Sequence, residues 1–174
     1  MVRSELCQMR GHVQRLVRSR IGIVSDTVGM SFTPHPEADQ RRRSAKTLIK
    51  MLLADRTPEA LPEHVRKLID TMLWKLTEAD GKHNTRHRSD GAMPHSDPRL
   101  LHHEHVFPKK KMIDDLQRAS SSDEIDCILA TAVGCVVTRD EHTRLSQYDH
   151  EVGWQRYRSA GIGVVNCETG ERVA

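Results

Sequence analysis

Aromatic residues are scarce in this chain. They make up 3% of its 174 residues, whereas hydrophobic residues as a whole make up 37%. A hydrophobic core must therefore be built mainly from leucine, isoleucine, valine and methionine. A chain of this length is long enough to bury such a core within one domain.

Paired cysteines and long apolar runs are also lacking. The four cysteines are widely spaced and form no CxxC pair, which argues against a disulfide framework and against a zinc site made wholly of cysteines. No apolar run is long enough to cross a bilayer, and the first ten residues lack the continuous apolar segment of a secretory signal. We therefore expect a protein of the reducing cytoplasm that does not associate with membranes.

Neither sign of charge is in large excess, because the chain has 27 Lys and Arg residues and 24 Asp and Glu residues, which gives a formal net charge of +3. The basic residues are nevertheless clustered, for example at positions 41–43 and 109–111. Such clusters suit a polyanionic partner such as nucleic acid, and an ordinary solvated surface also carries them.

Three segments have the apolar spacing of amphipathic helices. In residues 2–18 the apolar positions recur at alternating intervals of four and three, so this helix packs on the body of the protein or on a second copy in a homodimer. A second helix is expected over residues 37–54. Thr57-Pro58 is expected to cap and begin a third helix, which Gly81 ends.

Residues 82–98 are polar, basic and rich in turn-forming residues. One interpretation is a surface loop. The other is a substrate loop in which Lys82, Arg86 and Arg88 bind phosphates, since this segment leads directly into the histidine-rich stretch that follows.

The histidine-rich stretch, residues 101–108, has the sequence LHHEHVFP and predicts a short strand that ends before the proline. Side chains alternate along a strand, so His103 and His105 share one face while His102 and Glu104 share the other. Imidazole and carboxylate groups together suit one divalent cation, such as zinc, manganese, nickel or magnesium.

A later segment supplies another histidine on a well-defined element. Residues 135–137 predict a short strand, and Thr138 followed by Glu141 matches a capping box, which begins a helix near Arg139. His142 then lies in the first turn of that helix. A similar capping box at Ser121 predicts a preceding helix, and residues 162–165 predict one more strand.

These features resemble the HNH endonuclease motif, whose fold is also called ββα-metal. The resemblance is carried by the Glu104-His105 pair followed by Pro108, and by a strand that leads into the helix bearing His142. It covers residues 101–146. The family's middle asparagine, which ties down the loop that holds the base, is absent, because Val and Gly occupy positions 133 and 134.

The resemblance implies a metal-dependent endonuclease, a hydrolase that cleaves the phosphodiester bonds of nucleic acid, DNA in preference to RNA. It assigns His105 as the general base and Glu104 and His142 as ligands of the cation, with His103 as an alternative ligand to Glu104. The lysines that follow Pro108 are expected to hold the flanking phosphates, and they are Lys109, Lys110 and Lys111.

We therefore expect an α+β protein, mainly helical, with a small ββα-metal centre in its C-terminal half. Residues 1–80 would form a helical segment that packs on the site, and residues 81–174 an HNH-like metal domain, together one compact domain. Two alternatives stay open: a non-catalytic nucleic-acid-binding protein with a structural metal or histidine cluster, and an interaction protein that dimerises through its N-terminal helix.

Overall fold

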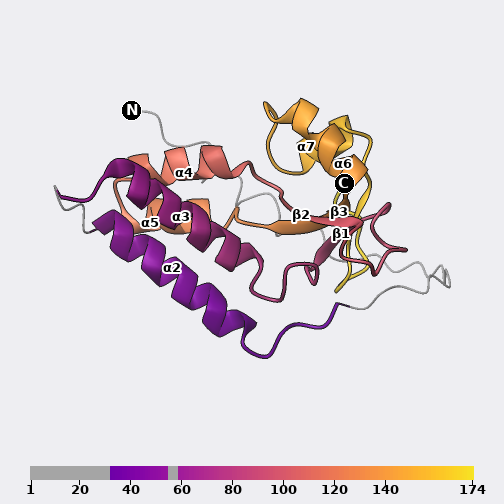
Figure 1. The fold of residues 1–174 in the computed structure, drawn as a ribbon, viewed down its shortest axis with the longest axis horizontal. Coiled ribbons are helices and arrows are strands. Elements are labelled where there is room, and N and C mark those ends of the chain that lie inside the picture. The colour runs from indigo at the N-terminus through magenta and orange to yellow at the C-terminus, as the bar shows by residue number, and fades with distance from the viewer. Residues whose placement is uncertain (1–31, 55–58) are drawn as a thin grey trace, which may run out of the picture.

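The computed structural model describes residues 32–54 and 59–174. In this part of the chain the protein is a mixed α+β structure, about 48% helical, with a small four-stranded sheet (Figure 1). The helix predicted over residues 2–18, its role in a dimer and the cap predicted at Thr57-Pro58 lie outside the described residues. Among the described residues, no helix is both long enough and apolar enough to cross a membrane.

Four helices pack together at one end of the molecule (Figure 1). They are α2 (Ala38–Ala54), α3 (Pro62–Thr77), α4 (Lys109–Arg118) and α5 (Ser122–Leu129). The second predicted helix is confirmed by α2. The third helix begins at Pro62, later than Pro58. Proline suits the first turn of a helix, because the first N–H groups of a helix have no carbonyl partner and proline lacks an N–H.

The helical core crosses the domain boundary that the sequence suggested. Ile49 of α2 and Ile69 and Leu73 of α3 are fully buried, and they pack with Leu116 of α4 and Leu129 of α5. The helices on both sides of residue 80 therefore share one aliphatic core, as the composition predicted.

The sheet has the strand order β2-β3-β1-β4. Its strands are β2 (Leu101–His105), β3 (Gly134–Thr138), β1 (His87–Ser89) and β4 (Val164–Asn166). β2 is antiparallel to β3, and β1 is parallel to β3 and antiparallel to β4. The sequence predicted β2, β3 and β4, but β1 lies in the segment predicted to be a loop, because three residues are too few to show an alternating pattern.

The two faces of the sheet have different neighbours. On one face lie α6 (Arg139–Leu145) and α7 (Trp154–Ser159), and their residues Leu145 and Tyr157 pack against Cys135 and Val137 of β3. On the other face, the end of α3 brings Trp74 against the rings of the two histidines at positions 103 and 105. Strand β2 therefore lies between the end of α3 on one face and α6 on the other.

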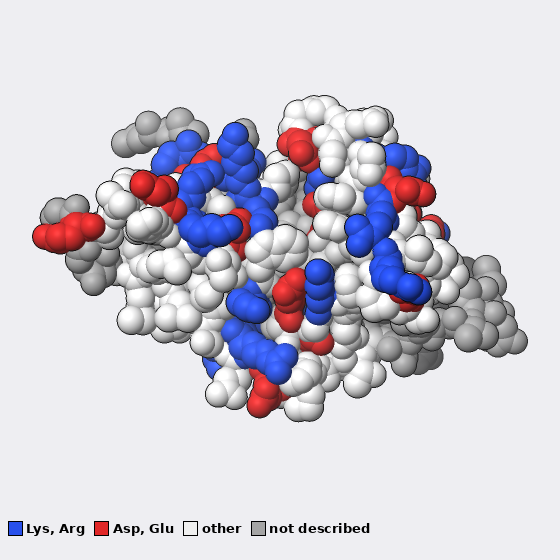
Figure 2. Space-filling model, viewed as in Figure 1, with Lys and Arg blue, Asp and Glu red and all other residues white. Residues whose placement is uncertain are grey.

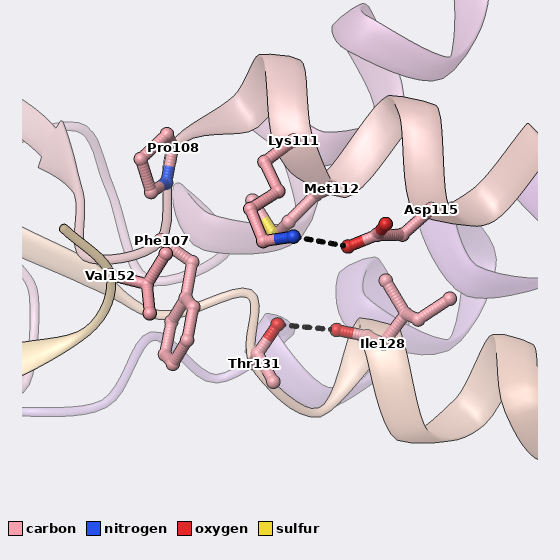
Figure 3. A pocket seen from close by; sticks show the side chains of 8 residues that line it. All are labelled: Phe107, Pro108, Lys111, Met112, Asp115, Ile128, Thr131 and Val152. Atoms are coloured by element: carbon pink, nitrogen blue, oxygen red, sulfur yellow. Dashed lines mark hydrogen bonds and ion pairs between the residues drawn. The ribbon is translucent and has the colours of Figure 1, made fainter. Parts of the chain in front are cut away.

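Phe107 joins the two hydrophobic cores, because it packs against both of them. Beside it lies a cavity of about 20 Å³, room for about one water molecule, between α4, α5 and Val152 (Figure 3). An ion pair between Lys111 and Asp115 and a hydrogen bond from Thr131 to the carbonyl of Ile128 hold its walls. The junction between the helices and the sheet is thus nearly filled.

The helical core predicts a contrast between two neighbouring residues of α3. Ile69 is 0% exposed and Leu68 is 49% exposed. Ile69→Ala should lower the free energy of unfolding by about 2–5 kcal/mol, because it removes apolar contacts and leaves a cavity, whereas Leu68→Ala should change it by less than about 1 kcal/mol. Urea unfolding followed by circular dichroism measures both, and equal losses would contradict this assignment of the core.

Candidate metal centre

Three side chains from two elements meet on the α6 side of the sheet, and we call them the trio: His102 and Glu104 of β2 and His142 of α6. One possible ligand atom from each lies within 4.8 Å of the other two. His142 Nδ1 and Glu104 Oε2 are 2.5 Å apart. The rings of His102 and His142 are stacked, with centroids 3.8 Å apart and planes inclined by 20°.

Strand alternation and a helix cap place the trio. The register of β2 against β3 puts His102 opposite Val137 and Glu104 opposite Cys135, so that both side chains face α6. The predicted capping box at the start of α6 is confirmed, since Thr138 accepts from the N3 amide and Glu141 accepts from the N-cap amide. This cap fixes the direction in which the helix leaves β3.

Glu141 is itself buried and has a second partner that fixes it. Ser89 of β1 donates from its hydroxyl to Glu141 Oε2 across 2.6 Å. A side chain at Gly91 would place its Cβ 2.5 Å from Glu141 Oε1, so the close approach of the backbone requires glycine there. The start of α6 is thus tied to β1 as well as to β3.

The second oxygen of Glu104 contacts a buried cation. Arg156 of α7 donates from Nη1 to Glu104 Oε1 across 3.1 Å, and the arginine side chain is 3% exposed. Glu104 is therefore held between an imidazole and a guanidinium, one on each oxygen, which keeps its carboxylate in a fixed orientation.

Burial and nearby charged groups together shift the pKa of His102. Burial lowers the pKa of His102 most, and the neighbouring His142 lowers it next, while Glu104 raises it. Arg139 and Lys82 also lower the pKa of His102 through their charges. A neutral imidazole is the form that binds a metal ion.

The donor set of the trio suits a divalent metal ion. Two imidazoles and one carboxylate are the ligands of catalytic zinc in several enzymes, and of other first-row transition metals with open coordination positions. Magnesium prefers oxygen ligands throughout, so this set favours zinc, manganese or nickel over magnesium. The trio can therefore hold one such ion.

His103 and His105 point to the opposite face of β2, toward α3. His103 is 1% exposed, and its Nδ1 donates to the carbonyl of Lys82 across 2.8 Å. His105 is 4% exposed and packs edge-on against Trp74, with ring centroids 4.4 Å apart. The Thr77 hydroxyl lies 3.0 Å from His103 Nε2 and 3.2 Å from His105 Nε2.

This placement separates the predicted site residues into two groups. The structure brings together Glu104 and His142, as the sequence predicted, but it does not bring His103 to them as an alternative ligand. It also keeps His105, the predicted general base, on the buried face and away from the trio. The His105 ring in that position contacts Trp74 and Thr77 and does not face Glu104 or His142.

The predicted phosphate-binding lysines lie in the first turn of α4, where Figure 2 shows Lys and Arg side chains gathered. Lys109 pairs with Asp70 across 2.7 Å and lies over the ring of Trp74. Lys111 pairs with Asp115 across 3.5 Å, and Lys110 is exposed. Because Lys109 lies over Trp74, and Trp74 packs on His105, Lys109 adjoins the face of β2 that is turned away from the trio.

The basic residues of the segment before β2 have three different environments. Arg88 is 5% exposed and donates to the carbonyls at positions 83, 92 and 95, so it holds that segment together and its guanidinium is not free to bind a phosphate. Arg86 pairs with Glu168 across 2.8 Å. Lys82 is exposed and is the one of the three whose charge acts on His102.

Sequence reasoning did not assign three residues to the site: His102, which is a member of the trio, and the cations Arg139 and Arg156. The signal for His102 was present, because alternation in the strand already placed it on the face of Glu104. Arg139 lies three positions before His142 and thus on the same side of a helix, which is a weaker signal. No local pattern connects Arg156 with Glu104.

Comparison of the chain with protein-family models, with curated proteins and with solved structures finds no match.

The trio makes a direct prediction for metal binding. His102→Ala, Glu104→Gln and His142→Ala should each weaken the binding of one equivalent of Zn²⁺ or Mn²⁺ by more than about 100-fold, since changes one shell further out already cost 10–100-fold. His103→Gln, the matched control on the other face of β2, should keep wild-type affinity. Isothermal titration calorimetry measures all four variants, and loss of binding in His103→Gln with retention in His102→Ala would reverse the assignment.

The buried histidines make the stability depend on pH. Burial lowers the pKa of His103 from 6.5 to about 4 and that of His105 from 6.5 to about 3. Between pH 6.5 and these values the unfolded chain binds protons that the folded chain does not, so the free energy of unfolding should fall as the pH falls through this window and should not depend on these groups above it.

Urea unfolding from pH 7.5 to 4.5 in the presence of EDTA tests this dependence. His103→Gln should reduce the slope of the free energy of unfolding against pH by the amount that corresponds to roughly one proton bound on unfolding. His150→Gln is the control, because its side chain is 73% exposed. A wild-type free energy that does not change over this range would refute the burial of neutral histidines.

Proposed function

We propose that the protein is a metal-dependent endonuclease of the HNH type, which hydrolyses phosphodiester bonds of nucleic acid with a cation held by His102, Glu104 and His142. The observation that carries the proposal is the trio itself, formed where two antiparallel strands, β2 and β3, lead into the helix α6. This order of elements supports the proposal, because the resemblance implies a ββα arrangement. Here α4 and α5 are inserted between the two strands.

The charges around the trio favour a polyanionic substrate. Arg139 and Lys82 are exposed and their charges act on His102, while Arg156 pairs with Glu104. Arg139 is fixed in place, since its Nε donates to the carbonyl of Arg99 across 2.6 Å. Among the described residues its two terminal nitrogens have no protein acceptor, so they are available to a phosphate.

A bound divalent cation stabilises the negative charge that develops on the scissile phosphate and on the leaving oxygen. Glu104 and the two imidazoles would hold that cation, and Arg139 and Lys82 would bind the phosphates on either side of the cleaved bond. His105 is not assigned a part in the reaction, because it faces Trp74. We assign it a role in packing β2 against α3.

Cleavage of supercoiled plasmid DNA, with RNA as a second substrate, tests the proposal. The wild-type protein should nick DNA when Mn²⁺, Mg²⁺ or Zn²⁺ is supplied, and EDTA should stop the reaction. His142→Ala should reduce cleavage to background because it removes one ligand, whereas the exposed His150→Ala should cleave like the wild type. A protein that binds the cation but cuts neither DNA nor RNA would refute the proposal, and salt-sensitive binding without cleavage would indicate a non-catalytic binding protein.

The same assay tests the role of His105. A folded His105→Gln variant should retain both cation binding and cleavage, because the ring lies on the buried face of β2. Lost cleavage with intact folding and intact cation binding would instead support the general-base role that the resemblance implies.

A further inference from the structure

Arg156 brings a buried guanidinium against the trio from α7, an element that the resemblance does not include. Its nitrogens have acceptors in three different segments. Nη1 lies 3.1 Å from Glu104 Oε1 and 3.4 Å from the carbonyl oxygen of His105, both in β2. Nε donates to the carbonyl of Leu145 across 3.2 Å, and Nη2 pairs with Asp149 across 2.7 Å.

These contacts fix the guanidinium in one position. A planar guanidinium that donates in several directions at once cannot turn without breaking several hydrogen bonds. Arg156 is 3% exposed on its side chain, so water does not replace a partner that is lost. The position of Arg156 therefore determines the orientation of the Glu104 carboxylate, and not the reverse.

The two oxygens of Glu104 have different environments as a result. Oε2 faces His142 within the trio, and Oε1 accepts from Arg156. Binding a cation through both oxygens would draw Oε1 away and cost the buried Nη1 of Arg156 its carboxylate acceptor, which is unfavourable. Buried ion pairs of this kind are a poor means of stabilising a fold, since their desolvation offsets much of the attraction.

We infer that Arg156 is a positioning residue, which restricts Glu104 to binding the cation through Oε2 alone. The inference rests on the cation site of the proposed function but not on the nature of its substrate. A carboxylate that binds through one oxygen occupies one coordination position and not two. Arg156 thereby leaves a further position for the substrate.

Titration of the full chain with Co²⁺, followed by visible absorption, tests this role, because the intensity of the absorption bands reports the number of ligands around cobalt. Arg156→Met removes the donor while it keeps a chain of similar shape. It should weaken Co²⁺ binding by roughly 10–100-fold. It should also lower the absorption per bound ion, because Glu104 becomes free to bind through both oxygens and the number of ligands rises.

Arg158→Met is the matched control, because Arg158 lies on the same helix, is exposed and, within the described part of the chain, donates to the carbonyl of Val173 and not to Glu104. It should leave both the Kd for Co²⁺ and the absorption at their wild-type values. An Arg156→Met protein that folds and shows wild-type absorption would overturn the inference, even if its affinity were lower, because a purely structural role would weaken binding without changing the ligand number.

Asp149→Asn serves if Arg156→Met does not fold. The Asp149 side chain is 63% exposed, and its replacement loosens the guanidinium without removing it. Affinity and absorption should change in the same direction as for Arg156→Met but by less, and unchanged values would overturn the inference.

If wild-type protein does not bind Co²⁺, or if Glu104→Gln binds it equally well, the cation site itself fails and the inference fails with it. If Co²⁺ binding behaves as expected but no nucleic acid is cut, only the nuclease proposal fails.

Discussion

Glu104 carries a carboxylate into a nearly closed part of the protein, and the contacts of its two oxygens organise the surrounding elements. A buried carboxylate is costly unless hydrogen-bond donors satisfy its oxygens. Here the donors come from α6 and α7, through His142 and Arg156, while the strand that carries Glu104 belongs to the sheet. Three segments far apart in the sequence must therefore be correctly placed before this one group is satisfied.

Strand β2 has two polar faces with different chemistry, although its sequence contains three histidines within four residues. The face with His103 and His105 is sealed by Trp74 and Thr77, and its imidazoles are held neutral by burial. The opposite face is only partly covered and keeps its imidazole near other charged groups. The same residue type thus has a packing role on one side of a strand and a candidate ligand role on the other.

Much of this arrangement could be predicted from local sequence. The capping box at Thr138 and Glu141 gave the start of α6, and the alternation in β2 assigned its side chains to their faces correctly. Alternation alone did not decide which of those side chains form the site. The resemblance directed attention to adjacent residues, Glu104 and His105, whereas alternation places Glu104 with His102 and therefore identifies the third member of the trio.

The remaining features depend on contacts between distant segments, which one sequence does not reveal. β1 is three residues long and exists because it pairs with β3 on one side and β4 on the other. Arg156 meets Glu104 across 52 positions of the chain. Arg88 looked like a phosphate-binding residue in a basic segment, but folding turns it inward onto backbone carbonyls.

The shared aliphatic core also limits how the chain can be divided. The apolar faces of α4 and α5, with Met112, Leu116, Ile128 and Leu129, are covered by α2 and α3. A shortened chain that begins after α3 would expose these side chains to water as one apolar patch that favours aggregation. It would also lose Trp74 and Thr77, which cover the face of β2 that carries His103 and His105. The half that carries the trio therefore depends on the helices that precede it for its solubility as well as for its shape, and it is not expected to behave as a portable module.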